Sequence, residues 1–245
     1  MPLRAYYEDE FSTIFLGDCR KVLPDLSGTI DAVFDPPYGV GVQYGAGYDD
    51  SRKDYWEWFR GTLERIRLRC RVVVFTHRVP ALRELHGWDW VGPWCKPGAF
   101  GSRIGNSCVL PHWEPVFMYG IHGLGTKSHY RSDVFNYNPK RAGSRNRHIG
   151  REKWQKENAA PHPCPKPLAL FDDLIRAFSQ DDAVILDPFM GSGTTLVAAK
   201  QLGRKSIGIE ISEAFCEVAA NRLRQQTLWP TPAASDSGAE QGSLL

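Results

Sequence analysis

The sequence predicts an α/β fold in which a mostly parallel sheet is covered by helices on both faces. Short apolar runs rich in Val, Ile and Phe alternate with longer helical patterns, as is typical of strands buried on both faces. The 245 residues are enough for one ordinary domain. The expected strands are residues 13–16, 32–34, 71–75, 115–119, 183–186 and 206–209, and the expected helices are residues 54–69, 79–86, 166–178, 194–202 and 213–226.

Local turn signals justify these elements in chain order. The run that reaches residue 34 must stop at Pro36 and Pro37, because proline fixes φ and cannot donate a backbone hydrogen bond. A proline-rich segment, residues 162–167, opens the helix expected at 166–178, and proline is common in a first helical turn. A glycine-rich loop separates the strand at 183–186 from the helix that follows it.

Composition excludes several classes of protein. Apolar residues make up 42% and charged residues 24% of the chain, which is a globular balance, and the net charge of +2 indicates no particular partner. No apolar run approaches the roughly 20 residues that cross a bilayer, and the first residues turn acidic without a signal-peptide core. The six cysteines form no CxxC pair, so we expect no metal site and a cytoplasmic protein without a membrane partner.

Three segments break the alternation of strands and helices. Residues 39–50 hold four glycines and are expected to form a mobile loop. Residues 122–161 carry nine Lys/Arg and three Asp/Glu with little periodicity, which indicates a basic insert. The end of the chain is rich in Pro, Ser, Ala and Gly and is expected to be disordered. The predicted division is therefore 1–121, the insert 122–161, 162–229, and a tail at 230–245.

The turn at residues 35–38 presents a carboxylate, a proline carbonyl and an aromatic ring in fixed geometry. It follows a strand, and open α/β sheets bind ligands at the carboxyl ends of their strands. Asp35 and the Pro36 carbonyl can each accept one N–H of an exocyclic amino group, and Tyr38 can stack on a flat base. A plain Pro-Pro turn with an Asx-type bond from Asp35 is an equally good interpretation of this motif alone.

The loop from Asp187 to Thr195 places glycines between a strand and a helix N-terminus, where an anionic group can bind. A dinucleotide fingerprint would need a further glycine where Leu196 stands, and a Walker A loop would need a lysine. Glu210, 17 residues after Gly193, ends the next strand and is placed to accept two ribose hydroxyls. The alternatives are a packing turn without a ligand for the loop and a solvated glutamate for Glu210.

Two further segments are weaker signals. Asp18 follows another strand, and an N-cap is the alternative to a binding role. The segment 162–167 is explained equally well as a helix start with proline in its first turn.

Together these motifs resemble the β-type S-adenosylmethionine-dependent DNA amino-methyltransferases, the N6-adenine and N4-cytosine DNA methylases. Asp-Pro-Pro-Tyr at 35–38 comes first, the basic insert second, and Asp-Pro-Phe-Met-Gly-Ser-Gly-Thr-Thr at 187–195 last, as in that family. The segment 162–167 and Trp113-Glu114-Pro115-Val116 also resemble family motifs, with Pro165 as an extra residue before Lys166. The resemblance covers residue 13 to about residue 226. It implies a Rossmann-like fold with a circularly permuted motif order.

The resemblance also implies roles for residues. Phe189 would pack beside the methionine part of S-adenosylmethionine, Glu210 would hold the ribose, and Asp18 would accept from the adenine amino group, with Lys166 near the methionine carboxylate. The catalytic residues implied are Asp35, Pro36, Pro37 and Tyr38. The cofactor-binding residues implied are Asp18, Cys19, Asp35, Lys166, Asp187, Pro188, Phe189, Gly191, Gly193, Thr194, Glu210 and Ile211.

Methyl transfer to an amino nitrogen of a base explains both the acidic turn and the basic insert. Hydrogen bonds from the amino group to Asp35 and Pro36 stabilise positive charge developing on nitrogen as it attacks the sulfonium methyl. The base must be flipped out of the duplex against Tyr38. We expect double-stranded DNA to be held by basic residues of the insert, with Lys140, Arg141, Arg145 and Arg147 as the DNA-binding candidates.

Several alternatives remain open from sequence. Aspartate in the first position of the proline motif favours adenine N6, with cytosine N4 as the alternative target. RNA or protein methylation and a DNA-binding module without activity are further alternatives, and the basic insert and intact motifs favour an enzyme that acts on DNA. The enzyme is expected in a bacterium, an archaeon or a phage, as a monomer or homodimer, and a cognate restriction endonuclease is a candidate partner.

Overall fold

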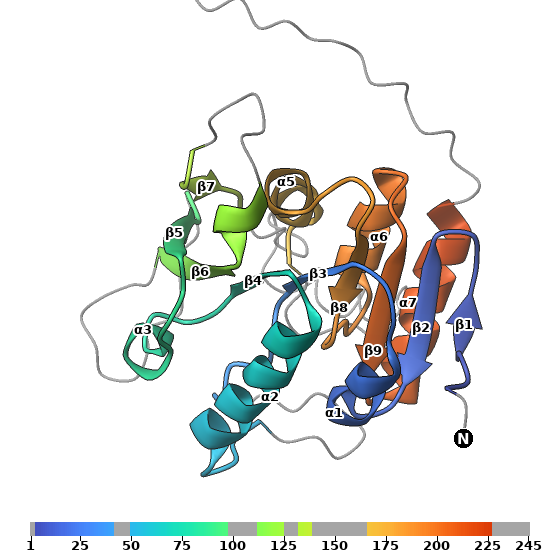
Figure 1. The fold of residues 1–245 in the computed structure, drawn as a ribbon, viewed down its shortest axis with the longest axis horizontal. Coiled ribbons are helices and arrows are strands. Elements are labelled where there is room, and N and C mark those ends of the chain that lie inside the picture. The colour runs from blue at the N-terminus through green and yellow to red at the C-terminus, as the bar shows by residue number, and fades with distance from the viewer. Residues whose placement is uncertain (1–2, 42–49, 98–111, 125–131, 139–165, 227–245) are drawn as a thin grey trace, which may run out of the picture.

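The computed structural model describes residues 3–41, 50–97, 112–124, 132–138 and 166–226, which build a nine-stranded sheet (Figure 1). The strand order is β1-β2-β9-β8-β3-β4-β6-β5-β7. The strands are β1 (Tyr7–Glu8), β2 (Ser12–Leu16), β3 (Ile30–Phe34), β4 (Val72–Thr76), β5 (Trp90–Cys95), β6 (Trp113–Tyr119), β7 (Phe135–Asn136), β8 (Val184–Asp187) and β9 (Ser206–Glu210). The helices are α1 (Cys19–Val22), α2 (Tyr55–Arg69), α3 (Ala81–Glu84), α5 (Leu168–Phe178), α6 (Thr194–Gln201) and α7 (Glu213–Gln226), with short 3-10 turns η1 (Leu23–Asp25) and η2 (Ile121–Leu124).

The centre of the sheet is parallel and its margins are mixed. Strands β2, β9, β8, β3 and β4 run parallel to their neighbours, whereas β1 pairs antiparallel with β2, and β6 pairs antiparallel with both β4 and β5. The predicted mostly parallel sheet is therefore confirmed. The six strands expected from apolar runs all occur, each with bounds within two residues of those expected.

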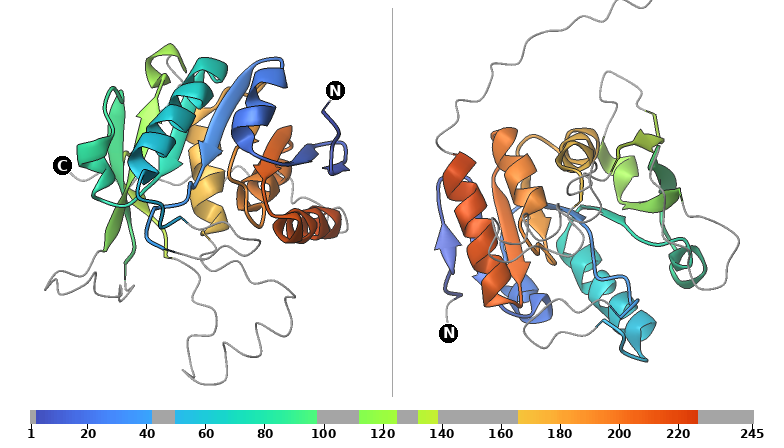
Figure 2. Two further views of the ribbon diagram at one scale, coloured as in Figure 1. Left: turned by 90° about the horizontal axis from the view of Figure 1, so that it is seen from below. Right: turned by 180° about the vertical axis from the view of Figure 1, so that it is seen from behind.

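Side chains of the central strands alternate between two separate cores. In β3, Ala32 and Phe34 face α1 and α2, whereas Val33 faces α5 and α6. Helix α2 buries one stripe at helical spacing, which includes Tyr55, Phe59, Leu63 and Ile66. A third core joins β2 to α6 and α7. The two layers of helices, on opposite faces of the sheet, are visible when Figure 1 is compared with the rear view in Figure 2.

Two predicted helices are shorter than expected. The helix predicted at 79–86 is only the single turn α3, because Pro80 stands at its N-cap and Leu85 is extended. Helix α5 begins at Leu168 and not at Lys166, since proline disfavours helical backbone in the residue before it and Pro167 forms the N-cap.

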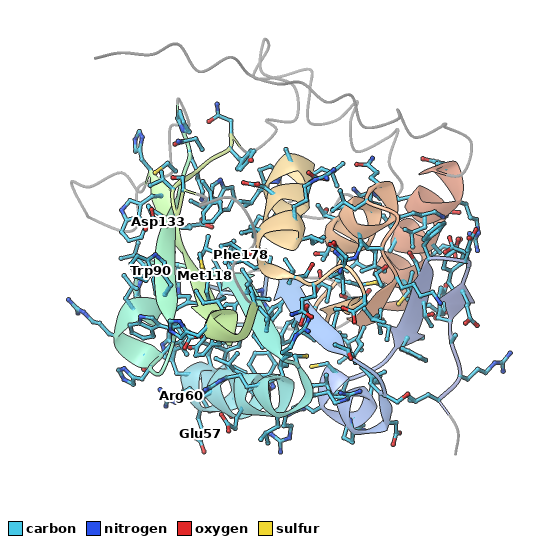
Figure 3. The ribbon with its side chains drawn as sticks, turned by 45° about the horizontal axis from the view of Figure 1, so that its top comes forward. Glu57, Arg60, Trp90, Met118, Asp133 and Phe178 are labelled. Carbon is cyan, nitrogen blue, oxygen red and sulfur yellow. The ribbon has the colours of Figure 1, made fainter. Side chains whose placement is uncertain are left out.

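A mixed sheet margin was not expected from the sequence. Strand β5 contains Gly92 and Pro93, which weaken a strand pattern, and β7 has only two residues. The indole of Trp90 donates to Asp133 over 3.0 Å (Figure 3), and Phe135 is buried against α5. Residues 132–138, within the predicted basic insert, therefore form part of the sheet and its core.

Several predicted features lie outside the described residues. These are most of the loop at 39–50, the tail after Trp229, and the candidate DNA-binding residues Lys140, Arg141, Arg145 and Arg147. Within the described part of the chain, no helix is long and apolar enough to cross a membrane.

Candidate active site

The turn at residues 35–38 and the glycine loop at residues 187–193 leave the sheet side by side. They follow β3 and β8, which are neighbouring parallel strands. The chain continues from β3 through α2 to β4 on one side, and from β8 through α6 to β9 on the other. Helices α2 and α6 cover opposite faces, so the two turns diverge and leave a crevice at their carboxyl ends. A crevice at such a switch point is where α/β sheets bind ligands.

A cavity of about 290 Å³ occupies this crevice. Both chain halves contribute to its wall: the proline turn and the segment after β2 from one half, and the glycine loop and the end of β9 from the other. Twelve residues predicted for the site line it, namely Asp18, Cys19, Asp35, Pro36, Pro37, Tyr38, Lys166, Pro188, Phe189, Gly191, Glu210 and Ile211.

The Asp35 carboxylate is held on three sides. Its Oδ1 accepts from the Tyr38 hydroxyl over 2.8 Å and from the Thr76 hydroxyl, and its Oδ2 lies 2.9 Å from the Lys166 ammonium. A carboxylate offers about four acceptor positions, so these contacts leave one position on Oδ2 for a further N–H donor. The side chain is 19% exposed and lines the cavity, so a ligand can reach it.

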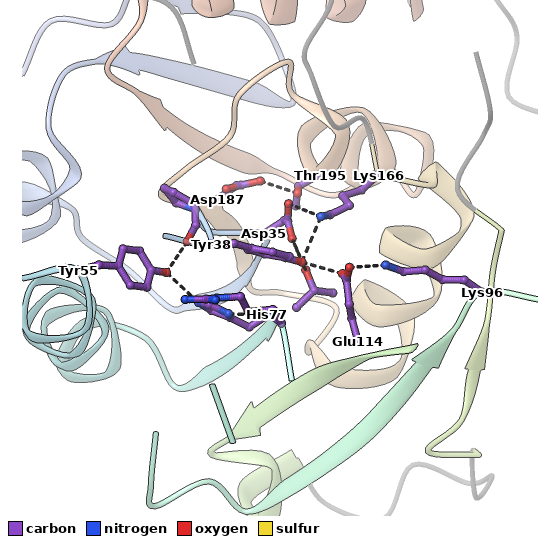
Figure 4. Close-up of polar contacts among 12 residues, drawn as sticks. Asp35, Tyr38, Tyr55, His77, Lys96, Glu114, Lys166, Asp187 and Thr195 are labelled. Carbon is purple, nitrogen blue, oxygen red and sulfur yellow. Dashed lines mark hydrogen bonds and ion pairs between the residues drawn. The ribbon is translucent and has the colours of Figure 1, made fainter. Parts of the chain in front are cut away.

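The Tyr38 hydroxyl joins Asp35 to a second ion pair (Figure 4). It lies 2.8 Å from Glu114 Oε2 and 3.1 Å from Lys166 Nζ, and Glu114 is paired with Lys96. Two lysines therefore balance two carboxylates around one phenol. Burial, together with the negative charges of Asp35 and Glu114, raises the pKa of Tyr38 well above its ordinary value, so the hydroxyl keeps its proton.

Glu210 anchors the glycine loop. Its Oε1 accepts from the Ser212 backbone N–H over 2.8 Å, and its Oε2 accepts from the Gly191 N–H over 3.0 Å. Each oxygen keeps a further acceptor position on the cavity side. Burial raises the pKa of this carboxyl, and the backbone bonds oppose that rise.

Asp187 lies beneath the loop and is not among the described residues that line the cavity. Its carboxylate accepts from the Thr195 hydroxyl over 2.5 Å and from the Phe189 N–H over 3.0 Å. Burial raises the pKa of Asp187 to about 7, and the charges of Asp35 and Glu210 add to the rise. These contacts favour a structural role beneath the loop.

Two other predicted residues also lie behind the loop. Gly193 has φ +78° and would bring a Cβ to 2.8 Å from Ala219, so it allows α7 to pack closely. The Thr194 hydroxyl lies 3.4 Å from Arg222 of α7, which also binds the Ser192 carbonyl. Neither Gly193 nor Thr194 is among the described residues lining the cavity.

Asp18 and Lys166 differ in detail from what the resemblance implies. Asp18 is the N-cap of α1 and pairs with Arg20, as the alternative interpretation expected, although it also lines the cavity. Lys166 contacts the Asp35 carboxylate and the Tyr38 hydroxyl, and so belongs to the proline turn.

Other residues of the site were not singled out by sequence reasoning. Thr76 and His77 come from the end of β4, and their position beside the proline turn depends on the pairing of β3 with β4. Trp58 of α2 lines the cavity and contacts the Phe189 ring, with centroids 6.0 Å apart. The remaining lining residues are Gly17, Arg20, Val40, Arg52, Glu114, Ile209, Ser212 and Phe215.

Comparison with known proteins agrees with this geometry. The family model described as DNA methylase, for N6 and N4 methyltransferases, matches residues 115–221. The putative methylase YubD of Escherichia coli K12 is 41% identical over 223 residues, which span 86% of this chain and 90% of that protein. The chain belongs to the N6/N4 DNA methylase family.

Other relatives support this assignment. Type II methyltransferase M.HpaI of Haemophilus parainfluenzae is 28% identical over 231 residues, 83% of this chain and 71% of that protein. Three further type II methyltransferases match over 65, 74 and 75 residues, which are 21–26% of their own length.

Solved structures show the same Rossmann-like methyltransferase fold, which confirms the predicted fold class. The PvuII cytosine-N4-specific DNA methyltransferase has a TM-score of 0.69 at 16% identity, covering 90% of this chain and 89% of that one. M1.HpyAVI in complex with S-adenosylmethionine has a TM-score of 0.56 at 20% identity, covering 86% and 99%.

S-adenosylmethionine is the cofactor of this family, and the cavity suits it chemically. Phe189 and Trp58 offer an apolar wall, Glu210 offers acceptors for hydroxyl groups, and several carboxylates near the cavity suit a cationic sulfonium.

Proposed function

We propose that this DNA methylase transfers a methyl group from S-adenosylmethionine to the N6 amino group of adenine in duplex DNA. The observation that carries the proposal is that Asp35 and the cofactor-half residues Phe189, Gly191 and Glu210 line one cavity. An amino group hydrogen-bonded to Asp35 would therefore lie close to the cofactor. Aspartate in the first position of the proline motif favours adenine over cytosine.

Bound S-adenosylmethionine supplies an electrophilic methyl group on its sulfonium. Asp35 Oδ2 and the Pro36 carbonyl accept the two amino hydrogens and so stabilise positive charge that develops on the nitrogen. Lys166 and Thr76 fix the Asp35 carboxylate in one orientation before the base arrives. Tyr38 provides the ring on which the flipped base stacks.

The cofactor half binds and orients. Glu210 accepts from the ribose hydroxyls with the acceptor positions that Gly191 and Ser212 leave, and Phe189 packs beside the methionine chain. The residues Asp18, Cys19, Pro188 and Ile211 complete the wall. Double-stranded DNA is held by the basic segment at 139–161, outside the described residues. A restriction endonuclease partner and the oligomeric state, monomer or homodimer, are separate questions that co-purification and light scattering address.

The test is tritium transfer from labelled S-adenosylmethionine to duplex DNA, RNA and protein, followed by nucleoside identification. We expect label in duplex DNA, recovered as N6-methyladenine. Recovery as N4-methylcytosine would move the target to cytosine, the specificity printed for the PvuII enzyme. Label only in RNA or protein would contradict the DNA assignment.

A further inference from the structure

His77 is buried directly behind the proline turn, yet the proposed chemistry does not use it. It follows β4 and is 0% exposed. Its ring stacks on Tyr38 with centroids 4.9 Å apart and planes 13° apart. Tyr38 lines the cavity, whereas His77 is not among the described residues that do. His77 therefore backs the Tyr38 ring on the side away from the ligand.

The hydrogen bonds of His77 assign its tautomer. The Arg78 backbone N–H donates to His77 Nδ1 over 2.8 Å, so Nδ1 carries no proton. The Tyr55 hydroxyl donates to the Pro37 carbonyl and lies 2.8 Å from His77 Nε2. Because the only hydroxyl proton of Tyr55 is used on Pro37, Nε2 must donate to Tyr55. The result is a directed chain from His77 through Tyr55 to Pro37 (Figure 4).

The surroundings of His77 favour the neutral ring that this chain requires. Burial lowers its pKa well below the ordinary value, and the positive charges of Arg78 and Lys166 act in the same direction. Trp56 stacks on the imidazole at 5.2 Å, and Phe59 lies at the same centroid distance with a tilted plane. A protonated ring would place a second N–H against that of Arg78.

We propose that His77, as the Nε2–H tautomer, is a positioning residue for methyl transfer: it holds the Pro37 carbonyl through Tyr55 and supports the Tyr38 ring by stacking. One buried imidazole thus fixes both the backbone and the aromatic ring of the turn. The base stacks on a ring that is already backed, as the next layer after Trp56, His77 and Tyr38. This inference rests on the proposed function for its kinetic consequence but not for its tautomer.

The variants Tyr55→Phe, His77→Asn and His77→Gln test the chain. Glutamine can place an N–H₂ donor near the position of Nε2, whereas asparagine is too short to reach Tyr55. We expect Tyr55→Phe and His77→Asn to slow single-turnover methyl transfer by about tenfold to a hundredfold, since small misplacements cost that much. His77→Gln should recover part of the rate, and cofactor affinity should stay within about twofold because these residues do not line the cofactor half.

A double-mutant cycle separates this role from general damage. If His77 acts on Pro37 through Tyr55, His77→Asn should cost less in the Tyr55→Phe background than in the wild type. Additive effects, or wild-type rates in folded single variants, would overturn the proposal. A wild-type protein that methylates no DNA would instead contradict the proposed function.

Nitrogen NMR of ¹⁵N-histidine-labelled protein tests the tautomer without any activity. The His77 signals, assigned by their loss in His77→Gln, should show an unprotonated Nδ1 and a protonated Nε2 between about pH 5 and pH 8. Tyr55→Phe should shift Nε2 more than Nδ1. A protonated Nδ1, or a ring that titrates with an ordinary pKa, would refute the inference.

Discussion

Replacing Glu210 with alanine should weaken cofactor binding by an amount that the structure allows us to estimate. Its two oxygens each accept one backbone N–H and keep one acceptor position for a ribose hydroxyl. Hydrogen bonds to a charged acceptor contribute about 1.5–3 kcal/mol, so the dissociation constant of S-adenosylmethionine should rise roughly 10- to 150-fold. Isothermal titration calorimetry measures this change.

The same substitution also releases two loop bonds. Losing the bonds from Gly191 and Ser212 should lower the free energy of unfolding by about 1–3 kcal/mol, as followed by urea denaturation. Glu213→Ala is the matched control, because Glu213 is exposed nearby on α7 and is not among the described lining residues. Its cofactor affinity should stay within about twofold of wild type.

A cofactor analogue isolates the ribose contact from the loop. S-adenosylhomocysteine that lacks both ribose hydroxyls should bind wild type more weakly than intact S-adenosylhomocysteine. The Glu210→Ala variant should discriminate much less between the two ligands. Equal discrimination by wild type and variant would refute the proposed contact, whatever the variant does to stability.

Three other predictions follow from charge and backbone geometry. The raised pKa of Asp187, from an ordinary 3.8 to about 7, stabilises the fold at low pH, and this contribution is lost as pH rises through that window; subtracting Asp187→Asn unfolding data from wild type should reveal a slope of up to about 1.4 kcal/mol per pH unit, and a zero difference would contradict it. Gly193→Ala should cost about 2 kcal/mol or more, since it combines φ +78° with a contact at 2.8 Å to Ala219, whereas Gly203→Ala, with φ +66° and open space, should cost only about 1 kcal/mol in thermal or urea unfolding; equal costs would contradict the packing argument. Neutralising three arginines of the basic insert should flatten the salt dependence of duplex binding by about 0.9 in log–log slope per lost phosphate contact, without changing cofactor affinity; identical slopes would place DNA recognition elsewhere, and the residues are Arg141, Arg145 and Arg147.

Sequence patterns predicted the central sheet well because its strands are long enough to show a pattern. Buried runs such as Val72–Thr76 mark a strand on their own, and Pro36 with Pro37 marks where β3 must end. Strands β1 and β7 have two residues each, which is too short for any periodicity. Proline and glycine inside β5 hid a strand whose pairing with β6 is decided by tertiary structure.

The site was predictable where its residues follow strands in recognisable motifs. Asp35 and Glu210 are such residues, and the cavity brings them together. His77 carries no motif, because its position behind Tyr38 results from strand pairing and from a hydrogen bond with Tyr55 on another helix. The direction of a side chain was also not predictable: Thr194 lies near Arg222 of α7 and does not line the cavity.

The central claim, that Asp35 acts on the target amino group, is tested most directly by Asp35→Ala. Methyl transfer to duplex DNA and cofactor affinity should be measured on the same preparation, with exposed Asp25→Ala as control. We expect transfer to fall by at least about a hundredfold, the scale for a lost charge-stabilising group, with cofactor affinity changed far less. Near-normal transfer by a folded Asp35→Ala variant would contradict the assignment of this turn to catalysis.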